Sequence, residues 1–344
     1  MVYVPWPAPP AGEDGPHDRD EPCGEGRMSV VVLRALGLGD LLTGVPALRG
    51  LRDAYPGADI TLAAPSVLAP VAALSGAVDG VADTGPLQPL PRALYHADLA
   101  VDLHGRGPES TRLLLASRPR RLIAFAHPSL PATSGLPHWT PDEHEVSRWC
   151  RLLAECGIPA DPRRLGLPPP AEESPAPGVV IVHPGAAAPA RRWPAPRWAA
   201  VARKLSEDGW PVVVTGARAE RELAEKVAAR AGLPGNRVLA GRTSLTTLAA
   251  LCAEAALVLS GDTGIAHLAA AYSRPAVTLA GPVPPRLWGP PARPWHAILW
   301  AGRTGDPHGD RPDPGLLKLS VGDVLTATYR ILAAYRTLPN LPVP

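Results

Sequence analysis

The chain has 344 residues, of which 46% are hydrophobic and 5% aromatic, and its formal net charge is +2. This length is large for one hydrophobic core and favours two domains, and so small a net charge argues against a dedicated nucleic-acid-binding protein. No apolar run reaches the ~18–20 residues that cross a bilayer. Cysteines without zinc-like spacing indicate reduced thiols, so we expect a cytoplasmic protein.

Residues 1–27 differ from the rest of the chain. Acidic residues outnumber arginines there, Pro and Gly are frequent, and the apolar residues have no period. This composition predicts a disordered tail, and it contains no apolar segment resembling a signal peptide. Met28 stands directly before the first predicted strand and is a candidate for the true start of the protein.

From Ser29 onward, short apolar runs alternate with longer amphipathic segments, which predicts an α/β fold of parallel sheets and crossover helices. The first predicted domain is 28–165, with strands at 30–33, 60–63, 78–82, 99–103 and 121–125, and helices at 41–54, 67–75, 113–116 and 143–156. A proline-rich segment without apolar period follows, and residues 166–177 are the predicted linker.

The second predicted domain, 178–320, repeats the same alternation of strands and helices. Strands are expected at 179–182, 212–215, 238–239, 256–259 and 276–279, helices at 198–208, 218–231, 245–253 and directly after residue 264, and a last helix over 321–336. Two doubly wound domains that face one another bring the carboxyl ends of their strands, and hence the ligand, to the cleft between them.

The turn after the first strand, Ala-Leu-Gly-Leu-Gly-Asp-Leu over residues 35–41, is the first candidate binding segment. Its glycines, Gly39 among them, let the backbone approach a ligand closely. The pattern lacks the third glycine of the dinucleotide-binding fingerprint. Asp40 either caps the following helix or faces the cleft as a reactive carboxylate, and the sequence leaves both interpretations open.

Two turns of the second domain carry further candidates. Gly185 lies in the turn after residues 179–182 and precedes Arg191 and Arg192, and guanidinium groups suit a diphosphate. Of these two arginines we favour Arg192 and expect Arg191 to be solvated. The turn with Gly216 leads to Glu220, which either holds ribose hydroxyls or favours the start of a helix.

Residues 256–272 form a strand, a small polar turn and a helix. The turn Ser-Gly-Asp-Thr-Gly includes Asp262, Thr263 and Gly264, and a helix that starts there directs backbone N–H groups and the positive end of its dipole at one spot. Such a spot binds phosphate. In the alternative interpretation, Asp262 or Thr263 caps the helix and the glycines permit the turn.

Five spaced motifs together carry a resemblance: GLGDLLTGVPALRGLR, VDLHG, HPGA followed by RRWP, VVVTGARAE and SGDTGIAHLAAA. In this order, over residues 29–290, the chain resembles glycosyltransferase family 9, the ADP-heptose:lipopolysaccharide heptosyltransferases. The resemblance implies the GT-B fold, with two Rossmann-like domains across a cleft. It also implies an inverting, metal-independent transfer of a heptose-like sugar from ADP-heptose to a glycan or glycolipid hydroxyl, without a cofactor.

The resemblance also implies roles for single residues. Asp40 matches the catalytic base, and His104 lies on the acceptor side, where the family often has Gln. His267 either braces the turn before it or contacts the ligand. The donor-side residues are Gly39, Gly185, Arg192, Gly216, Glu220, Asp262, Thr263, Gly264 and His267. In this scheme Asp40 accepts the acceptor's proton, while Arg192 and the amides of Thr263 and Gly264 neutralise the leaving diphosphate.

Two other functions were weighed: a non-catalytic nucleotide-sugar-binding protein, and a GT-B-fold nucleotide-sugar epimerase, which needs additional carboxylates around the sugar. Residues 301–314 match no motif, and we expect a mobile polar loop over the cleft there rather than a metal site. A basic cluster in the first domain could bring the protein into peripheral contact with the inner face of the membrane. A solvated face is the favoured interpretation of these residues, which are Arg112, Arg118, Arg120 and Arg121.

Overall fold

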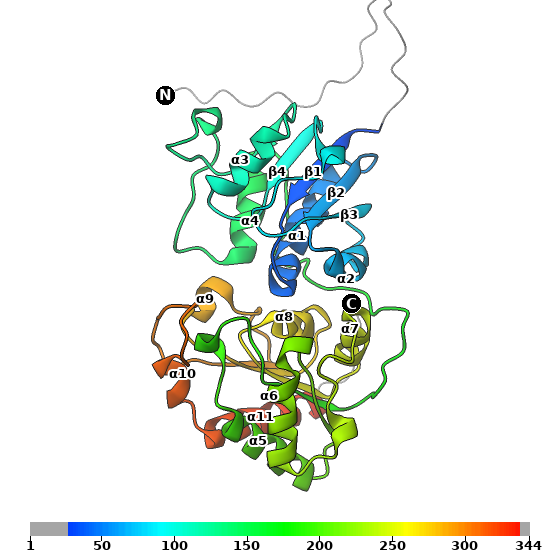
Figure 1. The fold of residues 1–344 in the computed structure, drawn as a ribbon, viewed down its shortest axis with the longest axis vertical. Helices are drawn as coiled ribbons and strands as arrows, with labels where there is room; N and C mark the ends of the chain where they lie inside the picture. Colours follow the sequence, from blue (N-terminus) through cyan, green and yellow to red (C-terminus); the bar gives the residue numbers. More distant parts are fainter. Residues whose placement is uncertain (1–26, 338–344) are drawn as a thin grey trace, which may run out of the picture.

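The structure, a computed structural model, describes residues 27–337. The predicted tail therefore lies, except for Arg27, outside the described residues. Within the described part, two parallel sheets occupy the two halves of the chain and lie one above the other along the long axis of the molecule (Figure 1). Residues 157–179, which join the halves, contain no helix or strand. The fold is the pair of doubly wound α/β units that the sequence predicted.

The N-terminal sheet has the strand order β3-β2-β1-β4-β5, and all its neighbours pair in parallel. Its strands are β1 Ser29–Leu33, β2 Asp59–Ala64, β3 Gly80–Asp83, β4 Leu99–Asp102 and β5 Leu122–Ile123. The helices are α1 Leu38–Ala54, α2 Ala69–Leu74, α3 Glu109–Ala116 and α4 Glu145–Glu155, with short 3-10 turns η1 Ser66–Leu68, η2 Arg92–Leu94 and η3 Pro131–Thr133.

The C-terminal sheet has the order β10-β9-β8-β6-β7, again entirely parallel. Its strands are β6 Val180–His183, β7 Val212–Val214, β8 Leu257–Gly261, β9 Ala276–Leu279 and β10 His296–Leu299. The helices are α5 Ala195–Glu207, α6 Arg221–Ala231, α7 Leu245–Ala253, α8 Gly264–Ala271, α9 Pro285–Trp288, α10 Pro314–Lys318 and α11 Val321–Thr337, with turns η4 Pro189–Arg191, η5 Arg218–Glu220 and η6 Gly235–Arg237.

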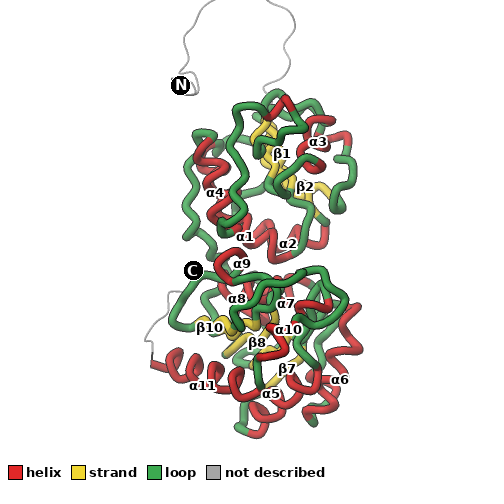
Figure 2. The backbone as a smooth tube through the Cα atoms, turned by 90° about the vertical axis from the view of Figure 1, so that its left-hand side faces the viewer, coloured by secondary structure: helices red, strands yellow, loops and turns green. Residues whose placement is uncertain are grey.

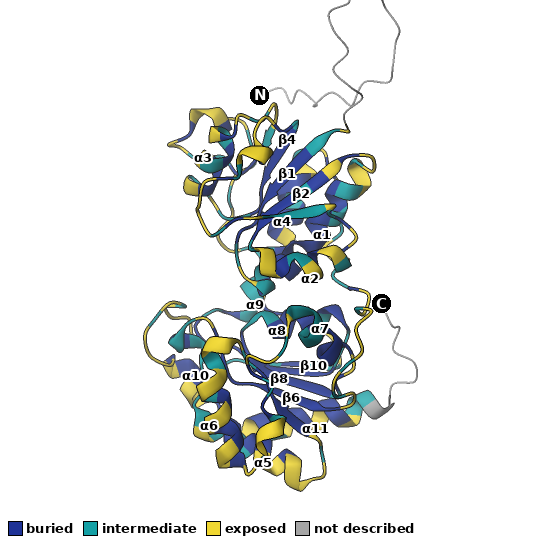
Figure 3. Cartoon of the chain, turned by 45° about the vertical axis from the view of Figure 1, so that its right-hand side comes forward, coloured by how far each residue is buried: buried dark blue, intermediate teal, exposed yellow. Residues whose placement is uncertain are grey.

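Both sheets are buried on both faces, because crossover helices cover each side (Figure 3). Val30, Val32, Val180 and Val182 are each 0% exposed, which explains why these strands appear in the sequence as continuous apolar runs rather than alternating ones. Among the described residues, no helix is both long and apolar enough to cross a membrane.

Several predicted elements differ from the structure. The strand expected at 238–239 is a single parallel bridge between Val214 and Val238. The strand expected at 121–125 covers only Leu122–Ile123. The bridge extends the C-terminal sheet to the order of a six-stranded Rossmann fold. Three elements were not predicted, because α9, β10 and α10 are short and lie among prolines and glycines that hide any apolar period.

In each sheet the strand order reverses at one point, between β1 and β4 and between β6 and β8. Ligands of doubly wound sheets bind beside the carboxyl ends of strands at such points. Here α1 follows β1 and α8 follows β8, so the N-termini of both helices lie at these points. The two helices meet at the boundary between the halves, with α9 beside them (Figure 2).

Candidate active site

A cleft of about 390 Å³ lies between the two domains at the reversal points of both sheets. Seven of the predicted site residues line it: Gly39, Asp40, Gly216, Glu220, Asp262, Thr263 and Gly264. The others, Gly185, Arg192, His104 and His267, do not. The lining also includes residues that were not predicted to be part of the site, among them His183, Arg191, Thr243, Ser244, Leu248 and Trp288.

The close approach of α1 and α8 forms the floor of the cleft. A Cβ on Gly264 would lie 2.9 Å from Leu38 Cβ and 3.1 Å from the backbone nitrogen of Gly39. A Cβ on Gly39 would in turn lie 3.5 Å from the Cα of Gly264. The two glycines therefore allow the helix N-termini to meet, and the N–H groups of a first helical turn have no partner within their helix. The floor of the cleft is suited to an anion.

Asp40 lies in the first turn of α1, whose N-cap is Gly37. The helix starts at Leu38 rather than at residue 41, so Asp40 is its third residue; its side chain caps the backbone N–H of Gly37 from inside the helix and also lines the cleft. Its Oδ2 accepts a hydrogen bond of 3.1 Å from the backbone N–H of Gly37, and the side chain is 28% exposed. Burial raises the pKa of this carboxyl group, while the guanidinium of Arg34 opposes the increase. A raised pKa strengthens a carboxylate as a proton acceptor.

Asp262 directly follows β8 and lines the cleft together with Asp40. It is 7% exposed, and its Oδ2 has no hydrogen-bond partner. Burial raises its pKa to about 6; Arg191 opposes this effect and Asp40 adds to it. Thr263 is the N-cap of α8, but its side chain makes no capping hydrogen bond. Neither residue therefore serves as a side-chain cap, and both polar side chains belong to the cleft wall.

Of the two arginines that follow β6, Arg191 lines the cleft and Arg192 does not, the reverse of what the sequence predicted. Arg191, at the end of η4, lines the cleft, with its NH1 at 3.7 Å from Asp262 Oδ2 and its buried Nε without a partner. Arg192 is not in the lining, and its Nε donates a 2.9 Å hydrogen bond to the carbonyl oxygen of Ala186. The structure thus favours Arg191 over the predicted Arg192 as the residue that meets an anion, because neighbouring residues in this tight turn point in different directions.

Glu220 lies at the end of η5 and projects into the same cleft. Its Oε2 accepts a 2.8 Å hydrogen bond from the backbone N–H of Ala217. A Cβ on Gly185 would come within 2.2 Å of the Glu220 carboxylate, so Gly185 makes room for this side chain without lining the cleft itself. His183 lies beside them, and its Nδ1 is 2.9 Å from Thr215 Oγ1. Burial lowers the pKa of His183, so the ring is neutral near pH 7.

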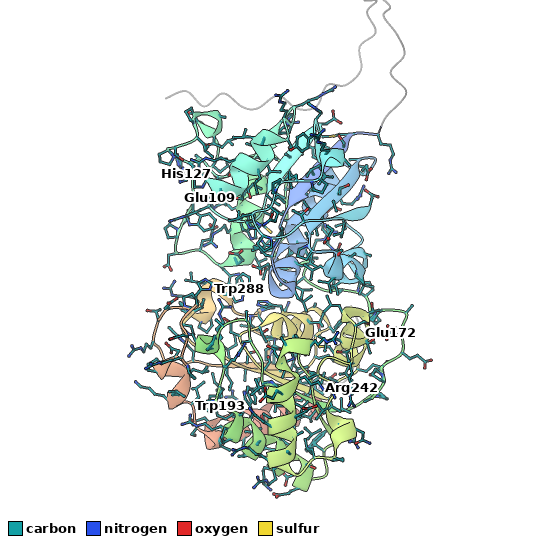
Figure 4. The ribbon with its side chains drawn as sticks, in the orientation of Figure 1. Glu109, His127, Glu172, Trp193, Arg242 and Trp288 are labelled. Carbon is teal, nitrogen blue, oxygen red and sulfur yellow. The ribbon has the colours of Figure 1, made fainter. Side chains whose placement is uncertain are left out.

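The two remaining predicted residues lie outside the cleft. His267 is a buried residue of α8, with its ring centroid 5.3 Å from that of Trp288 and its Cδ2 3.3 Å from a Cβ on Gly39. Burial lowers its pKa to about 4, and this position fits bracing of the turn rather than contact with a ligand. His104 follows β4, and its buried Nδ1 has no partner. Figure 4 shows Trp288 at the boundary between the domains.

Residues 301–314, expected to form a mobile polar loop over the cleft, contribute no residue to its lining. The carbonyl oxygen of Gly309 accepts from the N–H of Ala190, and the N–H of Asp313 donates to the carbonyl oxygen of Ala190, both at 3.1 Å. Asp313 also caps α10 through the N–H of Gly315. The segment therefore holds η4, and with it Arg191, in place. Within residues 27–337, no group of three or more His, Cys, Asp or Glu residues is arranged to hold a metal ion.

Two Rossmann-like domains, with helix N-termini, an arginine and two carboxylates converging in the cleft between them, are the arrangement of the GT-B fold. The family model of glycosyltransferase family 9 (heptosyltransferase) matches residues 136–313, more than half of the chain. The chain belongs to this family and is a glycosyltransferase. No curated protein matched the chain.

Solved structures support the fold. The chain is similar to Escherichia coli ADP-heptose lps heptosyltransferase II, with 22% identity, a TM-score of 0.73, and coverage of 90% of this chain and 100% of that one. It is also similar to E. coli heptosyltransferase WaaC with ADP-2-deoxy-2-fluoro heptose, at 21% identity, TM-score 0.65, and 88% and 99% coverage. A third similar structure is the iron-containing dodecameric glycosyltransferase TibC of E. coli, with 14% identity, a TM-score of 0.60, and coverage of 92% of this chain and 78% of that one.

Proposed function

We propose that this protein transfers a heptose-like sugar from ADP-heptose to a hydroxyl group of a glycan or glycolipid. One observation carries the proposal: Asp40 shares a cleft, floored by two helix N-termini, with the half-buried Arg191 and with Asp262, and both of these side chains have a buried polar atom without a hydrogen-bond partner. The choice of donor is supported by heptosyltransferase WaaC, which was solved with an ADP-heptose analogue.

The proposed reaction is a single displacement that inverts the anomeric centre. The acceptor oxygen forms a bond to the anomeric carbon as the bond from this carbon to the diphosphate breaks, and Asp40 takes the proton of the acceptor hydroxyl. A well-placed base of this kind contributes on the order of 10²- to 10⁴-fold to the rate. The bond electrons leave with the nucleoside diphosphate, whose added negative charge requires stabilisation.

The groups that would meet this charge are Arg191 and the backbone N–H groups at the start of α8. Guanidinium offers paired donors that match phosphate oxygens, and donors held in place before the reaction stabilise developing charge effectively. We therefore propose that transfer proceeds without a divalent metal. Because TibC is described as iron-containing, activity in the presence of excess chelator is the direct test of this part.

The nucleoside would extend away from Asp40 along the C-terminal domain. We propose that Glu220 accepts hydrogen bonds from ribose hydroxyls, and that the base lies at the end of the cleft formed by Thr243, Ser244 and Leu248. Nucleotide-sugars occur in the cytoplasm, where we propose that the enzyme acts. The acceptor would reach Asp40 from the N-terminal domain.

Two experiments test the proposal. A thermal-shift screen of ADP-, GDP- and UDP-sugars should show the largest stabilisation for an ADP-sugar, about 2.7 kcal/mol at a hundredfold excess over Kd. Product analysis then separates the alternatives: transfer or hydrolysis indicates the glycosyltransferase, an epimerised sugar indicates an epimerase, and binding without turnover indicates a binding protein.

The second experiment is Asp40→Asn, which keeps the side chain's size and its ability to accept the hydrogen bond from Gly37. Since the amide cannot take up the proton, turnover should fall by at least about a hundredfold, while the Kd for ADP and the melting temperature change little. Near-normal turnover of Asp40→Asn would refute the assignment of Asp40 as the base.

A further inference from the structure

Arg34, directly after β1, is a buried arginine that no motif singled out. It is 1% exposed, and its guanidinium donates to four oxygen atoms. Nε donates to the carbonyl oxygen of Asp40 and NH1 to that of Leu103. NH2 donates to Thr43 Oγ1 at 2.9 Å and to Glu145 Oε1 at 3.1 Å. A buried charge is costly unless it is paired and hydrogen-bonded, and Arg34 fulfils both conditions.

Gly44 and Trp149 pack closely around the side chain of Arg34. A Cβ on Gly44 of α1 would lie 3.0 Å from both Cδ and Nε of Arg34, so any larger residue there would press on this side chain. On another side, the Cζ of Arg34 lies 5.0 Å from the centre of the Trp149 ring, a distance at which an aromatic ring attracts a cation. The arginine is therefore held in one position beneath the first turn of α1.

Glu145, the first residue of α4, is the acidic partner of Arg34. Its side chain is 12% exposed. Besides Arg34, its carboxylate accepts from Arg148 NH1 at 2.5 Å and from Trp149 Nε1 at 2.8 Å. Glu145 thus lies between two arginines and attracts the guanidinium of Arg34 towards α4.

Arg34 hydrogen-bonds the main chain of Asp40 and not its carboxylate. The NH2 of Arg34 lies 3.9 Å from Asp40 Oδ1, beyond hydrogen-bonding distance. Arg34 instead holds the main-chain carbonyl of Asp40, to which Thr43 Oγ1 also donates at 3.0 Å. The arginine thus fixes the backbone of Asp40 but leaves Oδ1 without a charge-assisted hydrogen bond, which would otherwise favour the ionised form and weaken the base.

We propose that Arg34 and Glu145 form a buried pair of positioning residues that holds Asp40 toward the acceptor and sets its affinity for a proton. Arg34 fixes the peptide of Asp40 and attracts its carboxylate, and Glu145 limits this attraction by binding the guanidinium. Neither residue lines the cleft, so neither would touch the substrates. The inference rests on the proposed role of Asp40.

The charged groups around Asp40 come from three elements besides its own helix. Arg34 after β1 favours its ionised form and Glu145 on α4 opposes it, and Asp262 after β8 is a carboxylate whose own pKa is raised by Asp40. The N–H of Gly37 adds one hydrogen bond to the carboxylate. The signs of these contributions make the proposal testable, since neutralising Arg34 and neutralising Glu145 must move the titration of Asp40 in opposite directions.

The test is a ¹³C-carboxyl NMR titration of the full chain without substrate, in which the signal of Asp40 is assigned by its absence in Asp40→Asn. Arg34→Gln should raise the pKa of Asp40 by about one to three units, the usual effect of an opposite charge at this distance. Glu145→Gln should lower it. Trp149→Phe is the matched control, because it removes a hydrogen bond to Glu145 without changing any charge, and the pKa of Asp40 should stay at its wild-type value.

Where activity is measured, the acidic limb of the pH profile of kcat/KM should shift in the same directions, with the Kd for ADP nearly constant. If Arg34→Gln does not fold, Arg34→Lys, which keeps the charge, and Glu145→Gln still decide the question. Shifts in the same direction for both neutral variants, or no shift for Glu145→Gln, would overturn the pair. Because the titration needs no turnover, this failure is distinct from retained activity of Asp40→Asn, which would overturn the proposed function.

Discussion

Replacing Arg191 by alanine is the most informative single change in the donor cleft. Arg191 is the arginine of the lining, with a side chain that is 22% exposed and a buried Nε without a partner. Arg192, next to it in sequence, is engaged with the backbone of Ala186. The variants Arg191→Ala and Arg192→Ala therefore remove the same chemical group from adjacent positions, and only the first should remove a ligand contact.

The expected loss follows from the kind of bond. A charge-assisted hydrogen bond contributes about 1.5–3 kcal/mol, which corresponds to a Kd for ADP that rises about 10- to 150-fold. The loss should depend on pH. Asp262, whose pKa lies at about 6 with Arg191 beside it, loses its nearest cation in the variant, so its pKa rises further. Its protonation then relieves repulsion of the diphosphate, and the loss should be smaller at pH 6 than at pH 8.

The assay is titration calorimetry of ADP, repeated at pH 6 and pH 8, for the wild type and both variants. Thermal melts of the unliganded proteins serve as the control for folding. We expect a large decrease in affinity for Arg191→Ala and a small one for Arg192→Ala. An equal or larger effect of Arg192→Ala would refute the assignment of Arg191 and restore the one made from the sequence.

Three further changes test other parts of the site. Asp262→Asn removes a carboxylate whose pKa is raised to about 6 by burial. The folded wild type therefore gains stability as the pH falls from about 7 to 4, and in urea unfolding the variant should exceed it by on the order of 2–3 kcal/mol at pH 8 and by little at pH 4. A less stable variant at pH 8 would contradict this. Gly185→Ala places a Cβ 2.2 Å from the Glu220 carboxylate, so the Kd for ADP should rise about 2- to 12-fold, whereas Gly235→Ala, with no atom near its new Cβ, should bind normally. Flotation with anionic liposomes at physiological salt should leave the protein unbound, since Arg120 is paired with Asp98; cofloating protein would instead support membrane contact through the basic cluster.

The sequence by itself determined the class of fold and most of the cleft. Strands of a parallel sheet are buried on both faces, so they appear as unbroken apolar runs wherever they occur, as at 30–33 and 257–259. Their carboxyl ends must meet at one edge, and the turns there are local in sequence. Strand-turn-helix patterns alone therefore indicated Asp40, Glu220 and the Asp262–Gly264 turn as candidates for the cleft, with a role at a helix start as the open alternative, and the structure shows that all of them line it.

The tertiary structure decided what depends on direction or on distant partners. Arg191 and Arg192 are equivalent in composition and spacing, and only the path of η4, fixed by hydrogen bonds from Ala190 to residues 309 and 313, shows which one faces the cleft. Trp288 lies on α9, a helix of a single turn that is too short to show an apolar period in the sequence. Arg34 pairs with Glu145, which lies 111 residues further along the sequence. Local patterns carry no information about such a pair, because the low dielectric that makes a buried charge require a partner exists only after the chain has folded.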